Sequence, residues 1–391
     1  KGPNFNGNTF ALNAIEAGAQ YAITDEVTVE HPQILMVQDV LKTLQDLANY
    51  HRKQLKAKIV GIGGSNGKTT TKELVSAVLS TQYKIAFTKG NLNNHIGVPL
   101  TLLAIDADCE IAVIELGANH IGDIAELCQI AEPDLGIITN IGKEHLEGFG
   151  SIEGVAQAES ELYDFLLKTN GHAFVNADDV FLKEMGSKLS NKVEYGMLNS
   201  QLLNLDIVPD IRFQYKEQNI HSPLMGLHNV QNILACIAVA EFFHLSPEQI
   251  KQGIERYAPQ NNRSQWVQGK NNNKILLDAY NANPSSVEMA LKTFNAMQGD
   301  KMVMLGDMFE LGAHEAQQHQ AISDLCSEMN FNLVVLIGEA FFKTETKSSN
   351  IHLFQTKAQA RQFMSDQVKE NLSVLIKGSR GMKMEELIDL F

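Results

Sequence analysis

Apolar and polar residues alternate along most of the chain in a way that predicts strands followed by helices. Short apolar runs rich in β-branched residues predict strands at Ile59–Ile62, Ile111–Glu115, Leu135–Thr139 and Ala173–Asn176. Between them, apolar residues recur every three or four positions, which predicts helices at Lys68–Ser80, Ile121–Ile130 and Ile152–Leu167. Strands that alternate with helices form a mostly parallel sheet with helices on both of its faces.

A second block with the same alternation follows residue 261. Strands are expected at Ile275–Asp278, Met302–Leu305, Leu333–Ile337 and Leu372–Ile376. Helices are expected at Pro284–Ala296, Ala313–Met329 and Lys357–Val368. This block is therefore predicted to be a separate, Rossmann-like domain, and the polar run Pro259–Asn262 is the expected hinge.

The remaining stretches are less regular. Residues 1–54 form a short α/β piece, with helices expected at Thr9–Ala17 and Asp39–Leu55 and strands at Tyr21–Thr24 and Ile34–Val37. Residues 193–225 are β-rich and irregular, and a long helix follows at Leu227–Phe243. We therefore expect an α/β fold of three domains, over residues 1–54, 55–260 and 261–391.

Composition and charge narrow the class of protein. With 391 residues, the chain is long enough for two or three domains with separate cores. The formal net charge of −14 argues against binding to nucleic acid or to an anionic membrane surface. The apolar run Ile233–Ala240 is too short to span a bilayer, and no signal-peptide pattern opens the sequence. The cysteines are scattered without a Cys-x-x-Cys pair, which is typical of a reduced, cytoplasmic protein: Cys109, Cys128, Cys236 and Cys326.

The stretch Lys58–Thr71 carries the clearest chemistry. An apolar run ends in glycines, and Gly-Lys-Thr then opens a segment with helical spacing. A strand, a glycine loop and a helix in that order indicate a phosphate-binding loop, because glycines let backbone N–H groups surround phosphate oxygens. Lys68 would reach the β- and γ-phosphates, and the Thr69 hydroxyl would ligate Mg²⁺. The strict pattern has glycine at Ile62, so a glycine-rich turn in another α/β protein is the alternative.

Polar residues at other strand ends are further candidates, because ligands of open α/β sheets bind at the carboxyl ends of the strands. Glu115 ends a strand and could hold the Mg²⁺ of a nucleotide, or could only cap the following helix. His145 follows the next strand and could ligate a second metal or contact the γ-phosphate, or could be a solvated loop residue. His228 and Asn232 open an apolar helix and could face a nucleotide base, whereas Asn229 there could simply be an N-cap.

Polar loops supply further candidates for binding sites. The amide-rich loop Lys89–Pro99 could wrap a phosphate or a peptide, although ordinary turns have the same composition. In the last domain, three polar loops follow three strands: Asp278–Pro284, Gly306–Gly312 and Lys377–Gly381. Their convergence on one sheet edge indicates a binding site.

Several of these motifs together resemble the Mur ligases. They are Gly64–Thr69, Asn93–Pro99, Glu115–His120, Gly226–Asn229, Tyr280–Pro284, Gly306–Gly312 and Lys377–Arg380. The resemblance runs over the whole sequence and is strongest to the member that joins D-alanyl-D-alanine to UDP-N-acetylmuramoyl-tripeptide. It implies an ATP- and Mg²⁺-dependent amide-bond ligase of peptidoglycan synthesis that works through an acyl phosphate. It also implies that residues 1–54 are an incomplete UDP-sugar-binding domain, 55–260 an ATP-binding P-loop domain, and 261–391 a ligase domain.

The resemblance assigns roles by position. It places ATP on Gly64, Ser65, Asn66, Gly67, Lys68, Thr69, Thr70, His228, Asn232, Arg263, Asp278, Tyr280, Asn281 and Asn283. It places the other substrates on Asn93, Asn94, Asn119, His120, Lys377, Ser379 and Arg380. The implied metal ligands are Thr69, Glu115 and His145, and the implied catalytic residues are Lys68, His145 and Glu159.

Glu159 is a departure from the family. Most Mur ligases have a lysine here, whose carbamate gives the second Mg²⁺ an anionic ligand. We expect Glu159 to supply that charge directly. Its side chain is roughly 4 Å shorter than a carbamate, so a Mg²⁺-bound water would form the bridge. The alternatives are that Glu159 is only a solvated helix residue, or that Glu161 is the residue concerned.

Two other functions remain open from the sequence. A P-loop kinase or regulatory NTPase would need a base-specificity run of the type Asn-Lys-x-Asp, and none follows. A folate polyglutamate-type ligase is disfavoured by Gly306–Gly312 and Lys377–Arg380. The sequence leaves open diaminopimelate or lysine as the third peptide residue. We expect a monomer that binds neither nucleic acid nor membrane.

Overall fold

The strand predicted at Ile59–Ile62 lies inside a six-stranded, parallel central sheet. It is β3 (Lys58–Gly63), and the strand order is β4-β5-β3-β6-β7-β8. The other strands are β4 (Ile85–Phe87), β5 (Ile111–Glu115), β6 (Leu135–Ile138), β7 (His172–Asn176) and β8 (Lys192–Tyr195). The structure is a computed structural model that describes residues 5–26, 29–259, 262–346, 348–365, 367 and 370–391.

Helices cover both faces of this sheet, as predicted. One face packs on α3 (Lys68–Leu79), α9 (Leu227–Phe242) and α10 (Pro247–Arg256). The other face packs on α2 (Val40–Gln54), α4 (Gly97–Leu103), α5 (Asp123–Ala131), α7 (Ile152–Thr169) and α8 (Val180–Gly186). Because both faces are buried, the central strands β3 and β5 consist almost entirely of buried residues.

The C-terminal block has its own six-stranded sheet, with the order β12-β13-β17-β14-β15-β16. Its strands are β12 (Gln265–Gln268), β13 (Lys274–Asp278), β14 (Lys301–Gly306), β15 (Leu333–Ile337), β16 (Ile351–Phe354) and β17 (Ser373–Lys377). Only β12 runs antiparallel to its neighbour within this sheet. The covering helices are α11 (Pro284–Asn295), α12 (Glu315–Glu328) and α13 (Glu339–Phe342) on one side and α14 (Lys357–Met364) on the other. Short 3-10 turns complete it: η2 (Gly312–His314), η3 (Arg380–Met382) and η4 (Met384–Leu390).

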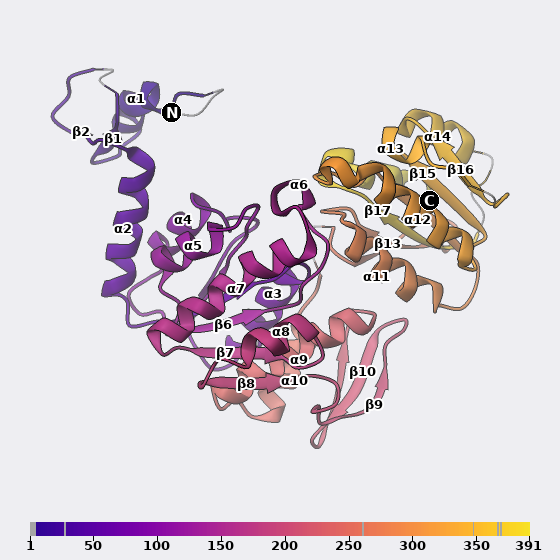
Figure 1. The fold of residues 1–391 in the computed structure, drawn as a ribbon, viewed down its shortest axis with the longest axis horizontal. Coiled ribbons are helices and arrows are strands. Elements are labelled where there is room, and N and C mark those ends of the chain that lie inside the picture. Colours follow the sequence, from indigo (N-terminus) through magenta and orange to yellow (C-terminus); the bar gives the residue numbers. More distant parts are fainter. Residues whose placement is uncertain (1–4, 27–28, 260–261, 347, 366, 368–369) are drawn as a thin grey trace.

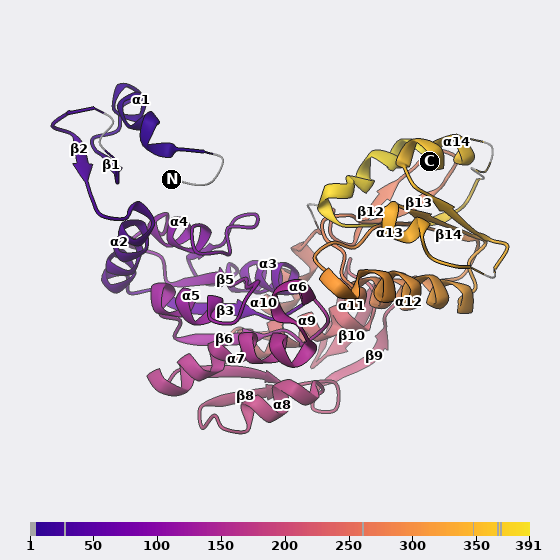
Figure 2. The ribbon, with the colours of Figure 1, turned by 45° about the horizontal axis from the view of Figure 1, so that its top comes forward.

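Two smaller pieces flank the central sheet. A 3-10 turn η1 (Gly7–Phe10), helix α1 (Ala11–Glu16) and the parallel strands β1 (Ala22–Thr24) and β2 (Ile34–Met36) lie at one end of α2. Figures 1 and 2 show this piece and the C-terminal domain at opposite ends of the molecule. An antiparallel sheet of β9 (Leu202–Asp206), β10 (Ile211–Tyr215) and β11 (Gln218–Ser222) packs on the α9 and α10 side.

The structure confirms the α/β fold class with mostly parallel sheets, and the predicted strands agree with the observed ones to within one residue. Five helix boundaries were wrong by two residues or more. The helix predicted from Thr9 begins at Ala11, after η1, and the one predicted to end at Leu167 continues to Thr169. Three others differ as follows. The helix predicted over Lys357–Val368 ends at Met364, the one predicted from Ile121 begins at Asp123, and the one predicted from Ala313 begins with η2. Gly122 causes the later start at Asp123, because its left-handed φ of 101° interrupts the helical backbone.

Several elements were missed from the sequence. The loop expected over Lys89–Pro99 already contains the start of α4, and β4, α8, α10, β12 and β16 had no predicted counterpart. Of the expected hinge Pro259–Asn262, residues 260 and 261 lie outside the described part of the chain.

Candidate active site

The loop between β3 and α3 needs glycine at two positions. Gly64 has a φ of 112°, and a Cβ there would lie 2.2 Å from the Thr139 hydroxyl oxygen. Gly67 has a φ of 82°, and a Cβ there would lie 2.6 Å from the Asn232 side-chain oxygen. The loop is therefore pressed against the end of β6 and the start of α9. This packing presents its backbone at the N-terminus of α3, where an anion is stabilised.

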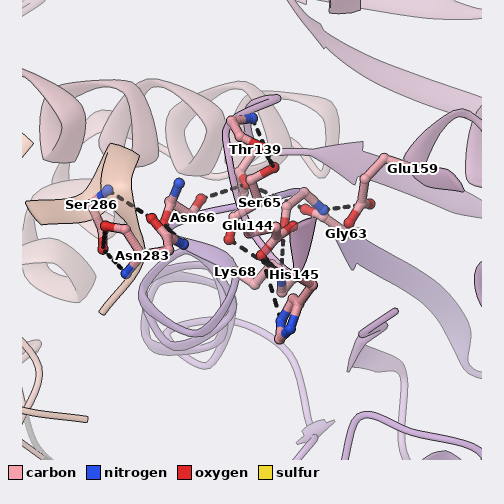
Figure 3. Close-up of polar contacts among 12 residues, drawn as sticks. Gly63, Ser65, Asn66, Lys68, Thr139, Glu144, His145, Glu159, Asn283 and Ser286 are labelled. Carbon is pink, nitrogen blue, oxygen red and sulfur yellow. Dashed lines mark hydrogen bonds and ion pairs between the residues drawn. The ribbon is translucent and has the colours of Figure 1, made fainter. Parts of the chain in front are cut away.

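Lys68 folds over this loop. Its ammonium donates to the Gly64 carbonyl oxygen and lies 3.4 Å from the Ser65 carbonyl oxygen. It also lies 3.5 Å from a carboxylate oxygen of Glu144, which is buried (Figure 3). Burial would lower the pKa of Lys68, but the nearby carboxylates, Glu144 first, outweigh it and keep the ammonium charged. Burial raises the pKa of Glu144 above its usual range, against the opposing effect of Lys68.

A group of oxygen donors lies beside Lys68. The Thr69 hydroxyl donates to one oxygen of Glu115 at 3.2 Å, and the Asn93 amide donates to the same oxygen at 2.9 Å. The second Glu115 oxygen is buried and accepts no hydrogen bond, although the Lys72 ammonium lies 3.4 Å from it. A buried carboxylate oxygen without a hydrogen bond, next to a hydroxyl, fits a hard cation such as Mg²⁺. Within the described ranges no group of three or more His, Cys, Asp or Glu side chains forms a metal cage.

Glu159 lies on the other side of the glycine loop. Its side chain is buried in α7 and accepts a hydrogen bond of 2.6 Å from the backbone N–H of Gly64 (Figure 3). The solvated-surface alternative for Glu159 is therefore wrong. Burial raises the pKa of Glu159, whereas the Lys68 charge and the Gly64 N–H favour the carboxylate. Glu161 instead caps the start of α5, accepting from Gly122 N and Ala125 N at 2.7 and 2.8 Å.

The C-terminal domain closes the site from the opposite side. Asn283 at the start of α11 donates from its amide to the Asn66 side-chain oxygen at 2.9 Å (Figure 3). Ser285 accepts a hydrogen bond of 2.9 Å from the backbone N–H of Lys143. His145 Nδ1 lies 2.5 Å from a carboxylate oxygen of Glu310. The two domains are thus in direct contact around the loop that follows β6.

The wall of the site beyond α3 carries aromatic and charged groups. The Arg263 guanidinium stacks on the Tyr280 ring at 3.8 Å from its centre. Lys377 and Asp278 form a buried ion pair at 2.5 Å. Burial would raise the pKa of Asp278, but Lys377 outweighs it and lowers the value. Burial lowers the pKa of His228 to about 4, and its Nε2 lies 3.1 Å from the Asn229 amide, so the ring is neutral near pH 7.

A cavity of about 340 Å³ brings most of the predicted residues together. Its lining includes Ser65, Asn66, Gly67, Lys68, Thr69, Thr70, Asn93, Asn94, Glu115, Asn119, His145, His228, Asn232, Arg263, Asp278, Tyr280, Asn281, Asn283 and Lys377. The predicted residues outside the lining are Gly64, His120, Glu159, Ser379 and Arg380. Ser379 is buried and accepts from Phe309 N at 3.0 Å, and Arg380 pairs with Glu385 at 2.9 Å. His120 is exposed.

A larger cavity, about 920 Å³, lies at the opposite, N-terminal edge of the central strands. Its charged residues already pair with one another, for example Arg52 with Asp134 at 2.9 Å and Lys53 with Glu132 at 3.3 Å. The phosphate-binding loop and the buried Glu115 oxygen that accepts no hydrogen bond both belong to the smaller cavity. We therefore place the active site there.

Sequence reasoning missed three charged residues of this site. Glu144 contacts Lys68, Lys72 contacts Glu115, and Glu310 contacts His145. Glu144 stands in the charged run Lys143–His145, in the loop that follows β6, which was an available signal. Lys72 lies one helical turn after Lys68 and so faces the same side of α3. Glu310 lies in the loop Gly306–Gly312, which the sequence did single out, but its contact with His145 had no local signal because the two residues belong to different domains.

Comparison with known proteins gives a consistent result. Residues 62–240 match the family model of the Mur ligase middle domain, and residues 262–380 match that of the Mur ligase glutamate ligase domain. The UDP-N-acetylmuramoyl-tripeptide--D-alanyl-D-alanine ligase of Bacillus subtilis (strain 168) is 35% identical, over 99% of this chain and 88% of its own length.

Solved structures agree with these matches. A crystal structure of MurF from Acinetobacter baumannii superposes with a TM-score of 0.89 at 31% identity, over 99% of this chain and 88% of that one. MurF ligase from Thermotoga maritima in complex with ADP superposes with a TM-score of 0.89 at 26% identity. The match covers 100% of this chain and 92% of that one. Among the described residues, every helix is too short or too polar to cross a membrane.

Proposed function

This chain belongs to the Mur ligase family, and we propose that it is the ATP-dependent ligase that joins D-alanyl-D-alanine to UDP-N-acetylmuramoyl-tripeptide. The observation that carries this proposal is the 35% identity to the Bacillus subtilis ligase over 99% of the chain. The site supports it, because a phosphate-binding loop and a second domain meet at one cavity. The product would be a peptidoglycan precursor.

The reaction has two steps. A carboxylate oxygen of the tripeptide attacks the γ-phosphorus of ATP, forming an acyl phosphate and releasing ADP. The amine of D-alanyl-D-alanine then attacks the acyl carbon, and phosphate leaves as the amide forms. The amine proton passes to solvent or to a basic group of the site.

Electrostatic repulsion is the main obstacle to the first step, because carboxylate and polyphosphate are both anions. Lys68 and the backbone N–H groups at the start of α3 would neutralise the β- and γ-phosphates. In the structure the Lys68 ammonium contacts Glu144 and loop carbonyls, which a bound phosphate would replace as partners. Catalysis would thus come mostly from positioning and charge stabilisation.

The donor set supports Mg²⁺ as the metal. Thr69 and Glu115 would hold a first ion and His145 a second, while phosphate oxygens and water fill the remaining positions. The ions would neutralise charge on the transferring phosphoryl group. Glu159 does not line the cavity, so direct ligation receives no support. We infer that the negative charge of Glu159 acts on a bound Mg²⁺ indirectly, through the Gly64 N–H and through water.

The other implied residues divide between the ends of the cavity. His228, Asn232, Arg263, Tyr280 and Asn281 line the wall proposed for the nucleotide. Asn93, Asn94 and Asn119 line the wall proposed for the tripeptide. Lys377, Ser379 and Arg380 bond mainly to other protein groups, which supports a role in shaping the acceptor side. We further infer a cytoplasmic location, for which the free, buried state of all four cysteines is the support, whereas the monomeric state stays a prediction.

A phosphate-release assay with combinations of substrates tests this function. We expect phosphate release to require ATP, Mg²⁺, UDP-N-acetylmuramoyl-tripeptide and D-alanyl-D-alanine together. Separate reactions with the lysine and diaminopimelate tripeptides will identify the third residue. Release with folate and glutamate, or release that needs no amine acceptor, would refute the proposal.

A further inference from the structure

A short loop of the central domain is held by the C-terminal domain at both of its ends. At one end, Ser285 accepts a hydrogen bond from Lys143 N at 2.9 Å. At the other end, the Glu310 carbonyl accepts from Glu147 N at 3.2 Å. Between these points, the Leu146 side chain is buried in the hydrophobic core of the C-terminal domain. The loop therefore belongs to the central domain in sequence but is packed by the other domain.

His145 and Glu310 form the polar contact at the centre of this interface. The imidazole Nδ1 lies 2.5 Å from the carboxylate Oε2. The side chain of His145 is 22% exposed and that of Glu310 is 58% exposed. His145 begins α6 (Leu146–Phe149), which Figures 1 and 2 show between the central and C-terminal domains.

Both residues have a backbone conformation that is rare outside glycine. His145 has a φ of 42° and Glu310 a φ of 62°. Such strained backbones persist only where surrounding contacts hold them, and they gather at functional sites. Among the thirteen described non-glycine residues with a positive φ, these two contact each other across a domain boundary.

The contact determines which imidazole nitrogen faces the cavity. A carboxylate accepts a hydrogen bond, so Nδ1 must carry the proton when His145 is neutral. Nε2 then carries the lone pair and lies at the cavity wall, 4.0 Å from a carboxylate oxygen of Glu144, which is too far for a hydrogen bond. Carboxylate partners commonly orient a histidine in this way at metal and phosphate sites.

We propose that Glu310 is a positioning residue, which fixes the tautomer and direction of His145 from the C-terminal domain so that the active site is complete only when the two domains meet. This inference rests on the proposed function of the site, and it adds a residue that acts through His145. The orientation of the His145 ring therefore depends on contact between the two domains.

The first test observes the imidazole directly. Long-range ¹H–¹⁵N spectra of protein with ¹⁵N-labelled histidine distinguish the Nδ1–H from the Nε2–H tautomer, and His145→Gln assigns the signals. We expect Nδ1–H in the wild-type protein and a shift toward Nε2–H in Glu310→Ala. Glu315→Gln removes an equal charge from an exposed position five residues away and should leave the spectrum unchanged.

The second test measures ligation by the same variants. Glu310→Ala should lower kcat by about 10- to 100-fold, the usual loss when the partner of a functional histidine is removed. KM for ATP should change by less than about 2-fold, because the phosphate loop is untouched. Glu310→Gln keeps an acceptor oxygen and should recover part of the rate, and Glu315→Gln should keep all of it.

An unchanged His145 tautomer in Glu310→Ala, or an unchanged kcat, would overturn the proposal. So would an equal tautomer change in Glu315→Gln, because the effect would then not belong to this contact. If the wild-type enzyme fails to ligate, the proposed function falls, while the spectra still decide whether Glu310 fixes His145.

Discussion

The Lys68 ammonium lies 3.5 Å from the Glu144 carboxylate, and both side chains are largely buried. Glu144 belongs to the loop that the C-terminal domain holds, and Lys68 belongs to the phosphate-binding loop. The pair therefore links the position of one domain to the group that would bind the γ-phosphate. It also explains how a buried lysine is kept charged before a phosphate arrives.

Replacing Lys68 by alanine should lower turnover by about 10²–10³-fold, since one preorganised charge at a transition state has roughly that effect. The fold should persist, because the Lys68 ammonium lies at the cavity wall, where it contacts loop carbonyl oxygens and Glu144. A phosphate-release assay measures the loss of turnover, and thermal unfolding shows whether the fold persists. Lys188→Ala, which changes an exposed lysine of the same domain, is the control. Near-normal turnover of Lys68→Ala would argue against the phosphate-loop assignment.

Glu159→Gln should lose most turnover, by about 10-fold or more, because it removes the charge while keeping an acceptor for Gly64 N–H. Added bicarbonate should not raise the activity of the wild-type enzyme, since a carboxylate is already present. Glu161→Gln is the matched control on the same helix, and it should affect the stability of α5 more than the rate. A strong bicarbonate requirement, or a fully active Glu159→Gln enzyme, would exclude this role.

His228 should make the folded protein sensitive to acid. Its pKa is lowered to about 4 by burial, whereas the unfolded value is near 6.5. Between these values the unfolded chain binds a proton that the folded protein does not, so the free energy of unfolding should fall as pH decreases from 6.5 to 4. Urea unfolding of the wild-type protein and His228→Asn at several pH values measures this. Parallel curves for the two proteins would mean that His228 titrates normally.

The C-terminal domain should close over bound nucleotide, because residues such as Asn283 and Tyr280 reach the site only when that domain meets the central one. Small-angle scattering should show a smaller radius of gyration with an ATP analogue and tripeptide substrate than without ligands. Glu310→Ala and Ser285→Ala should each weaken the change. Identical curves with and without ligands would contradict closure.

Local sequence patterns were sufficient for the parts of the site that depend on one strand end. Lys68, Thr69 and Glu115 lie where spacing alone puts them, because a parallel sheet brings the carboxyl ends of its strands to one edge. The strands were also predictable from local patterns, because strands buried on both faces are short apolar runs. Helix α10 also had a signal, a capping box at Ser246 and Gln249, that was overlooked.

Contacts between domains could not be predicted in this way. Leu146 appears as an ordinary apolar residue, and only the assembled structure places it in the C-terminal core. The pairing of His145 with Glu310 depends on how two separately folded sheets dock. The burial of Glu144 and Glu159 is equally invisible, because a charged residue in a polar helix or loop normally faces solvent.

The most direct test of the proposed reaction follows one oxygen atom. UDP-N-acetylmuramoyl-tripeptide labelled with ¹⁸O in both oxygens of its reacting carboxylate is ligated to D-alanyl-D-alanine, and the released phosphate is analysed by mass spectrometry. An acyl-phosphate mechanism transfers one carboxylate oxygen to phosphorus, so we expect one ¹⁸O atom in each released phosphate and one in the new amide. Unlabelled phosphate accompanying product formation would contradict attack of the carboxylate on ATP.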